Sequence, residues 1–255
     1  MRARLLDAEW VDGNATSGAG AASVKRNRQL PEDGEVTRAA QAQVSDALMG
    51  NATFLGAALP HSIFPPLFNR YGPGETFGLH VDNAIRFHSG SGARIRTDLS
   101  ATLFLTPPED YDGGELLIEG NSGTQSFKLA AGSMLLYPST TLHRVTEVTR
   151  GERVSCFMWL QSLVADHAER EMLFDLDRSV QALSSERGKT DPEVAALTVD
   201  DLRESRLIVQ DPGPIPDDEL KRTYDWIRSW GMLADTAVET DLVNVEAQRA
   251  AHSAA

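Results

Sequence analysis

Four residues at two places in the sequence could carry metal-dependent chemistry. His80 and Asp82 stand two positions apart, and His143 and Arg153 follow later in the chain. Two imidazoles and one carboxylate can bind one side of a metal ion and leave its other positions open, as in non-haem Fe(II) oxygenase sites. An arginine ten residues after the second histidine supplies a fixed cation for a carboxylate, such as that of a 2-oxo acid. We therefore predict His80, Asp82 and His143 as metal ligands and catalytic residues.

The spacing of the first pair suits a β-strand. Side chains at i and i+2 of a strand point to one face, about 6.5 to 7 Å apart. His80 and Asp82 could then reach one ion while Val81 turns into the core, and His143 would come from a later strand. The alternative for a His-x-Asp pattern taken alone is a hydrogen-bonded structural or surface histidine. The other histidines lack a second ligand at useful spacing: His61, His88, His167 and His252.

Arg153 opens a predicted strand with an unusual face. By parity it shares that face with Ser155, Phe157 and Trp159. A guanidinium among aromatic side chains is costly unless a carboxylate partner sits there too. The alternative is an arginine at the strand end that reaches solvent or pairs with a neighbouring acid. Tyr71 could donate its hydroxyl to an anionic co-substrate, although a core or rim tyrosine is the simpler interpretation.

The sequence around these residues predicts a mainly β fold with helices before and after it. Between residues 64 and 163, short apolar runs alternate with Gly, Pro and Asn turn signals about every ten residues, which is typical of a sandwich or barrel. Apolar residues at helical spacing precede and follow this region. We divide the chain into an N-terminal helical segment (1–60), a β core (61–165), a C-terminal helical extension (166–234) and a weakly ordered tail (235–255).

The segment 83–97 follows the first metal ligands and contains Arg86, Arg94 and Arg96. Such a segment could be a lid that orders around substrate, and its arginines would then favour an anionic substrate. An ordinary solvated loop is an equally good interpretation. The helix predicted after residue 216 carries two tryptophans, which would suit either a homodimer or burial against the chain's own barrel.

Charge and composition limit the partners. The 255 residues include 24 Lys and Arg against 37 Asp and Glu, giving a formal net charge of −13. We therefore expect binding neither to nucleic acid nor to a membrane surface. Cys156 is the only cysteine, so an internal disulfide is excluded. With acidic residues where a signal peptide would be apolar, the chain is predicted to be cytoplasmic.

Several motifs resemble those of one family. Residues 70–84 (RYGPGETFGLHVDNA) are similar to the first metal-binding segment of bacterial PKHD-type hydroxylases, relatives of the prolyl hydroxylases among the Fe(II)/2-oxoglutarate dioxygenases. Residues 110–116 (DYDGGEL), 137–145 (YPSTTLHRV), 149–155 (TRGERVS) and 159–162 (WLQS) resemble its later motifs. The resemblance covers residues 1 to about 185 and fades beyond Arg187.

The resemblance implies a double-stranded β-helix, or jelly roll, with Fe(II) (Fe²⁺) bound by His80, Asp82 and His143. It places the distal carboxylate of 2-oxoglutarate on Arg153, with Tyr71 helping to hold this co-substrate. It also implies O2 as a substrate, ascorbate as an auxiliary reductant, and hydroxylation of an unactivated C–H bond with release of succinate and CO2. Halogenation is disfavoured, because the carboxylate ligand Asp82 is present.

Two other functions stay open at this point. A cupin-like metal-binding sensor would keep the barrel and the metal but would not need Arg153 on the inner face. A zinc hydrolase would use a similar ligand triad with bound water as the nucleophile. Nothing in the sequence separates a small-molecule substrate from a peptidyl one.

Overall fold

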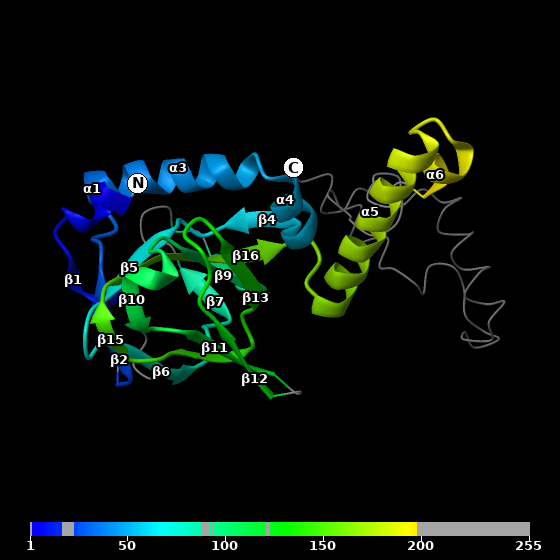
Figure 1. Ribbon diagram of the computed structural model, residues 1–255. Helices are drawn as coiled ribbons and strands as arrows, with labels where there is room; N and C mark the ends of the chain where they lie inside the picture. The colour runs from blue at the N-terminus through cyan, green and yellow to red at the C-terminus, as the bar shows by residue number, and fades with distance from the viewer. Residues whose placement is uncertain (1, 17–22, 88–91, 93, 121–122, 198–255) are drawn as a thin grey trace, which may run out of the picture. The chain divides into compact units, whose positions relative to one another are not determined.

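The computed structural model describes residues 2–16, 23–87, 92, 94–120 and 123–197 (Figure 1). The helix predicted after residue 216 and the predicted tail lie outside these residues. The helices are α1 (Arg2–Leu6), η1 (Gly13–Thr16), α3 (Glu35–Met49), α4 (Ala52–Ala58), η2 (Pro108–Asp110), α5 (His167–Arg187) and α6 (Pro192–Ala196). The strands before residue 100 are β1 (Val11–Asp12), β2 (Lys25–Arg26), β3 (Arg28–Gln29), β4 (Pro60–Ile63), β5 (Leu67–Tyr71), β6 (Thr76–His80), β7 (Ile85–Phe87), β8 (Arg94–Arg96) and β9 (Leu99–Phe104). The later strands are β10 (Tyr111–Gly113), β11 (Leu116–Gly120), β12 (Gly123–Phe127), β13 (Met134–Pro138), β14 (Leu142–Val145), β15 (Val148–Gly151) and β16 (Arg153–Ser162).

Two antiparallel sheets form the core. A seven-stranded sheet has the order β1-β3-β5-β16-β9-β13, with β4 paired to β16, and a five-stranded sheet has the order β12-β11-β14-β6-β2. From β5 onward the chain crosses repeatedly between them: β5, β9, β13 and β16 lie in the first sheet, and β6, β11, β12 and β14 in the second. This alternation is the topology of a double-stranded β-helix, so the predicted jelly-roll core is confirmed.

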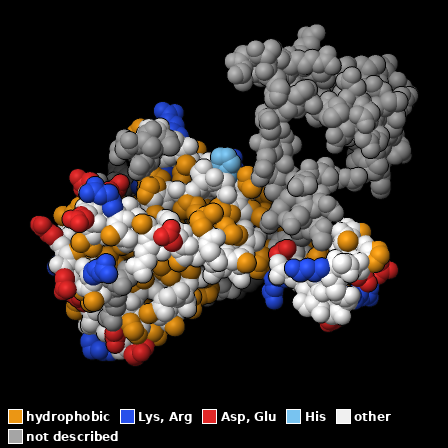
Figure 2. All heavy atoms as spheres, turned by 90° about the horizontal axis from the view of Figure 1, so that it is seen from above, with side chains coloured by type: hydrophobic (Ala, Val, Ile, Leu, Met, Phe, Trp, Pro, Cys, Tyr) orange, Lys and Arg blue, Asp and Glu red, His pale blue; other side chains and the backbone are white. Residues whose placement is uncertain are grey.

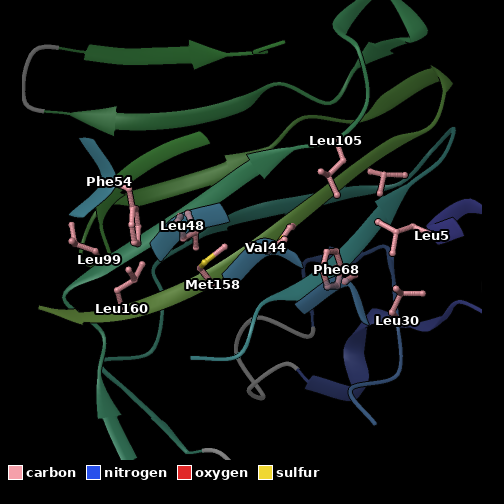
Figure 3. Close-up of a cluster of buried hydrophobic side chains, with 14 of the residues drawn as sticks. Leu5, Leu30, Val44, Leu48, Phe54, Phe68, Leu99, Leu105, Met158 and Leu160 are labelled. Carbon is pink, nitrogen blue, oxygen red and sulfur yellow. The ribbon is translucent and has the colours of Figure 1, made fainter. Parts of the chain in front are cut away.

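The outer face of the seven-stranded sheet is covered by α3. Thr37, Ala40, Val44 and Leu48 recur at helical spacing on its buried face. Ala40, Val44 and Leu48 belong to the same cluster of buried residues as the side chains of one parity from β16: Val154, Cys156, Met158 and Leu160. Figure 3 shows Val44 and Leu48 with Met158 and Leu160 of this cluster. The opposite parity of β16 is therefore free to face the inside of the barrel.

The N-terminal 60 residues are less helical than predicted. β3 pairs with β5 at the edge of the first sheet, and β2 pairs with β6 at the edge of the second. Each of these strands has only two residues, which is too short for an alternating hydrophobic pattern. Their conformation depends on the edges of strands far along the chain, so the predicted N-terminal segment, helical with a polar interruption, did not include them.

After the β core, α5 begins at His167, and the side chain of its N-cap residue Asp166 accepts a hydrogen bond from the backbone N–H of Glu169. Such a cap satisfies one of the free N–H groups of the first turn. No helix in the described residues combines the length and apolarity needed to cross a membrane. On the face shown in Figure 2, Lys and Arg side chains are scattered among acidic ones.

Candidate active site

His80 and His143 face each other across the β6–β14 pair. They are direct partners in the strand register, and their ring centroids are 4.2 Å apart. The Nε2 atom of His143 lies 3.7 Å from Oδ2 of Asp82. One ligand atom from each of the three residues lies within 4.8 Å of the others. The structure thus brings together the three predicted ligands, at spacing that one metal ion could bridge.

Both imidazoles are oriented by their own backbone. Nδ1 of His80 lies 2.8 Å from the carbonyl oxygen of Gly78, and Nδ1 of His143 lies 2.9 Å from that of Thr141. A carbonyl oxygen only accepts, so each Nδ1 donates, and in the neutral ring Nε2 then keeps its lone pair. Hydrogen bonds of this kind fix the tautomer of metal-binding histidines. The two Nε2 atoms are therefore prepared as ligands.

Burial, with a smaller contribution from His143, lowers the pKa of His80 to about 4. The ring of His80 also stacks on Phe77, with centroids 3.6 Å apart. At neutral pH the imidazole of His80 is therefore uncharged, which is the form that binds a metal ion.

Asp82 is placed differently from the prediction. β6 ends at His80, and Val81 is 51% exposed, so Val81 does not turn into the core. The chain leaves the sheet at this point, and the carboxylate of Asp82 is fixed by a separate strand: Ser100 Oγ on β9 donates to Asp82 Oδ2 at 2.6 Å. Ser100 is joined in turn to the hydroxyl of Ser139 at 2.8 Å.

Arg153 lies at the start of β16, and its side chain is only 2% exposed. One of its Nη atoms donates to Ser155 Oγ at 2.6 Å, and the Ser155 hydroxyl donates to Asn69 Oδ1. Its Nε is buried without a hydrogen-bond partner, and no carboxylate of the described residues forms an ion pair with it. A buried guanidinium with unused donors is a strong site for an anion.

Tyr71 and Arg153 are register partners on β5 and β16. The guanidinium carbon lies 5.3 Å from the ring centroid of Tyr71 and equally far from that of Phe104. Burial raises the pKa of Tyr71 to about 12, so its hydroxyl stays protonated and can donate a hydrogen bond. Gly114 leaves room for the Arg153 stem, because a Cβ there would lie 3.0 Å from Arg153 Cδ.

All five predicted residues, His80, Asp82, His143, Arg153 and Tyr71, line one pocket. The predicted parity of β16 is confirmed, since Ser155, Phe157 and Trp159 line it as well. Of the three arginines in segment 83–97, Arg86 lines the pocket, Arg94 is exposed, and Arg96 pairs with Asp98. Residues 88–91 and 93 of that segment, His88 included, lie outside the described residues.

Sequence reasoning missed two residues of this pocket. Ser100 is 18 positions from Asp82 and on another strand, so no local spacing signals it. Lys25 on β2 is only 6% exposed, and its Nζ donates to Gly13 O and Gln29 Oε1 at 2.7 Å each. A lone lysine beside a glycine-rich stretch carries no signal for a pocket. Burial, with a further contribution from Arg86, lowers the pKa of Lys25 to about 8.

Comparisons with known proteins agree with this geometry. The family model for the 2OG-Fe(II) oxygenase superfamily matches residues 66–161, and the model for the PKHD-type hydroxylase C-terminal domain matches residues 167–199. A PKHD-type hydroxylase of Rhizorhabdus wittichii is 56% identical over 198 residues, covering 78% of this chain and 87% of that protein. One of Burkholderia ambifaria is 59% identical over 195 residues, covering 76% and 86%. A solved prolyl-4-hydroxylase of Pseudomonas putida is 22% identical, with a TM-score of 0.41 over 63% of this chain and 81% of that one.

The β-helix, the site and the superfamily match define the class: this is a 2OG-Fe(II) oxygenase. Within that class, the chain belongs to the PKHD-type hydroxylase family. The family likeness also extends further than the sequence motifs indicated. It was expected to fade after Arg187, but the C-terminal family model includes α5 and α6 and ends at residue 199.

Proposed function

We propose that this chain hydroxylates an unactivated C–H bond of a small-molecule or peptidyl substrate, and that His80, Asp82 and His143 hold the iron. The observation that carries the proposal is the pairing of two features in one pocket. One is the ligand triad with both Nε2 atoms free, and the other is the buried Arg153 without a carboxylate partner.

The residues present fit the cofactors of the class. The triad offers two imidazoles and one carboxylate on one side of a metal, which suits Fe(II) and leaves positions open. When bound, Fe(II) and 2-oxoglutarate supply the oxidising chemistry: one oxygen atom of O2 enters the substrate as a hydroxyl group and the other enters succinate, with release of CO2.

The protein's own part is to bind, orient and exclude water. Arg153, supported by Ser155, would hold the distal carboxylate of 2-oxoglutarate through charge-assisted hydrogen bonds. Tyr71, protonated at neutral pH, would donate to the same anion. Phe157 and Trp159 place aromatic surface on the same wall, which limits water around the reacting groups.

Ascorbate as a reductant and a cytoplasmic location complete the proposal. Both are supported by the requirement of such a site for reduced iron.

The test is turnover without added substrate. Protein reconstituted anaerobically with Fe(II) is given 2-oxoglutarate and O2, and succinate is quantified. Asp82→Ala should lose the succinate signal, since it removes the charged ligand. Asp175→Ala, at an exposed position on α5, is the matched control and should behave as wild type.

A second measurement applies if the enzyme forms succinate only when its substrate is bound. The anaerobic Fe(II)/2-oxoglutarate chelate gives a visible absorption band, which wild type should show and Asp82→Ala should lose. A wild-type protein with neither succinate nor the band would contradict the proposal and favour a cupin-like metal-binding sensor.

A further inference from the structure

Arg86 lies in the wall of the same pocket but at the other end of β16 from Arg153. Its guanidinium carbon is 4.1 Å from the ring centroid of Trp159, so it stacks on the indole. The Arg153 guanidinium donates to Ser155, four residues before Trp159, which is about 13 Å along a strand. The two guanidinium groups therefore face different parts of the wall, and the distal carboxylate of 2-oxoglutarate is assigned to Arg153. Arg86 therefore needs another account.

The guanidinium of Arg86 has unused hydrogen-bonding capacity. Within the described part of the chain it forms no ion pair or hydrogen bond, and its Nε is buried. Arg96, on the neighbouring strand, shows the contrast: its Nε and Nη2 donate to Asp98 at 2.6 and 2.9 Å. A stacked guanidinium keeps its donors in the plane of the fork, where a carboxylate binds.

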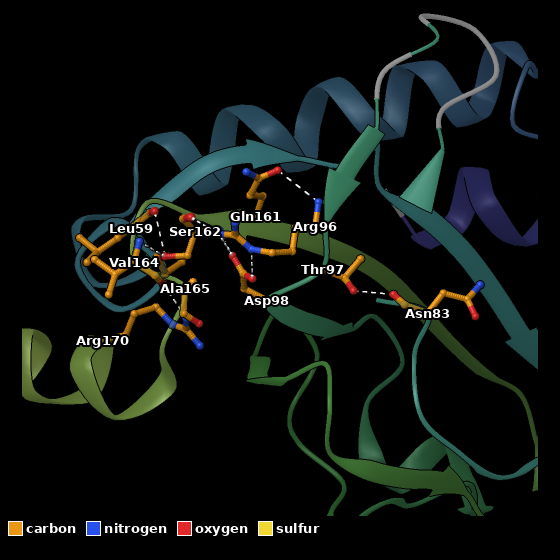
Figure 4. Close-up of polar contacts among 11 residues, drawn as sticks. Leu59, Asn83, Arg96, Thr97, Asp98, Gln161, Ser162, Val164, Ala165 and Arg170 are labelled. Carbon is orange, nitrogen blue, oxygen red and sulfur yellow. Dashed lines mark hydrogen bonds and ion pairs between the residues drawn. The ribbon is translucent and has the colours of Figure 1, made fainter. Parts of the chain in front are cut away.

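The hairpin that carries Arg86 is fixed at its base (Figure 4). Thr97 Oγ1 donates to the carbonyl oxygen of Asn83 at 2.5 Å, and the backbone N–H of Arg96 donates to Gln161 Oε1 at 3.1 Å. The first of these bonds ties β8 to the residue directly after Asp82. Arg86 is thereby held close in sequence and in space to the proposed metal ligand, rather than at the tip of a free loop.

The charges that line the pocket also favour an anionic substrate. Its charged lining residues are three cations, Lys25, Arg86 and Arg153, and one carboxylate, Asp82. A divalent metal ion and a dianionic co-substrate add no net charge. Two positive charges are left in a partly buried space, within a protein whose net charge is −13. A neutral substrate would leave them balanced only from outside the lining, where Glu32 acts on Arg86 and Asp12 on Lys25, whereas an anionic substrate would meet them in the pocket.

We propose that Arg86, supported by the indole of Trp159, binds a carboxylate group of the substrate at a second anion subsite. This rests on the proposed function, and it narrows the substrate class to molecules that carry a carboxylate besides the C–H bond to be hydroxylated. Lys25 adds positive potential to this subsite, while its own hydrogen bonds hold β2 against the pocket.

The test uses acetate as the probe and acetamide as its neutral counterpart. The protein is loaded with Mn(II) and saturated with 2-oxoglutarate, and paramagnetic relaxation of the probe protons is measured by NMR. Acetate should relax in wild type, and acetamide should not. Arg86→Gln should weaken acetate binding by at least about tenfold, since a charge-assisted bidentate contact is lost. Arg94→Gln, an exposed arginine of the same hairpin, is the matched control and should keep wild-type acetate binding.

The 2-oxoglutarate protons separate the two proposals. If 2-oxoglutarate relaxes but acetate binds equally well to wild type and Arg86→Gln, the second subsite is refuted and the proposed function stands. If acetate binding depends on Arg86 while the protons of 2-oxoglutarate do not relax, the proposed function is refuted and the subsite stands. If neither acetate nor 2-oxoglutarate relaxes in wild type, both proposals are refuted. Should Arg86→Gln fail to fold, Arg86→Lys decides, because it keeps the charge but loses the fork: unchanged acetate binding would contradict the subsite, and weaker binding would support it.

Discussion

Ser100 donates its hydroxyl to Asp82 at 2.6 Å, from the strand β9 to a carboxylate that has already left β6. The proposed charged ligand is thus held by a sheet to which it does not belong. Ser100 is itself 2% exposed and bonded to Ser139, so its position is set by the packed interior. The orientation of the proposed metal ligand depends on this one hydroxyl.

Ser100→Ala should therefore weaken the site while leaving the fold intact. Loss of such a supporting hydrogen bond typically costs about 10- to 100-fold in metal affinity or activity. The measurement is Fe(II) affinity and succinate formation at fixed 2-oxoglutarate. Ser126→Ala, on the exposed face of β12, provides the control. Equal affinity in both variants would show that Asp82 needs no support from β9.

Arg153→Lys should raise the KM for 2-oxoglutarate by at least about tenfold, because an ammonium lacks the planar fork that matches a carboxylate. Metal binding should change little, since the triad is untouched. Initial rates of succinate formation at varied 2-oxoglutarate give the KM, and titration of 2-oxoglutarate into the anaerobic Fe(II) protein, followed by the absorption band, gives the matching Kd. Arg150→Lys is the control, at an exposed arginine that pairs with Asp112. A KM unchanged from wild type would remove Arg153 from the proposed co-substrate site.

Gly114→Ala should disturb the same anion site through the backbone. Gly114 has a φ of +68°, and a Cβ there would lie 2.9 Å from Val148 Cγ2 and 3.0 Å from Arg153 Cδ. We expect a loss of roughly 1 to 3 kcal/mol in the free energy of unfolding and weaker 2-oxoglutarate binding.

Gly74→Ala distinguishes the effect of backbone strain from that of contact between an added Cβ and its neighbours. Gly74 also has a positive φ, +81°, but a Cβ there would meet nothing within 4 Å. Its substitution should lower stability without changing 2-oxoglutarate affinity. If both variants bind the co-substrate equally, Gly114 serves the turn alone and not the placement of Arg153.

The β16 residues that face the pocket could be predicted from the sequence, but the residues that hold the proposed ligands in place could not. The parity of β16 could be predicted because ten consecutive strand residues alternate between a sheet–helix core and the pocket. The position of Asp82 was only half right, since i and i+2 share a face only while the strand continues, and β6 stops at His80. Ser100 and Lys25 could not be predicted, because each reaches the site through pairing of distant strands.

Lys25 gives a prediction about pH. Burial lowers its pKa from 10.5 to about 8, so the unfolded chain binds more protons than the folded chain between these values. The contribution of Lys25 to the free energy of unfolding should therefore increase as pH rises from about 8 towards 10.5, by at most about 3 kcal/mol. Asp12, Asp82 and Arg86 act on the same ammonium and are not changed by the substitution.

Urea unfolding of the metal-free protein between about pH 7.5 and 9.5 measures this effect, below the range where tyrosines titrate. Burial also raises the pKa of the Cys156 thiol, which gives wild type and variants alike an opposite slope, so the difference between them is the readout. Lys25→Met should lack the gain in stability with rising pH that Lys25 gives the wild type. Lys189→Met, at an exposed lysine, should retain it. If the stabilities of wild type and Lys25→Met change in parallel across this range, the ammonium of Lys25 is better solvated in the folded protein than its burial indicates.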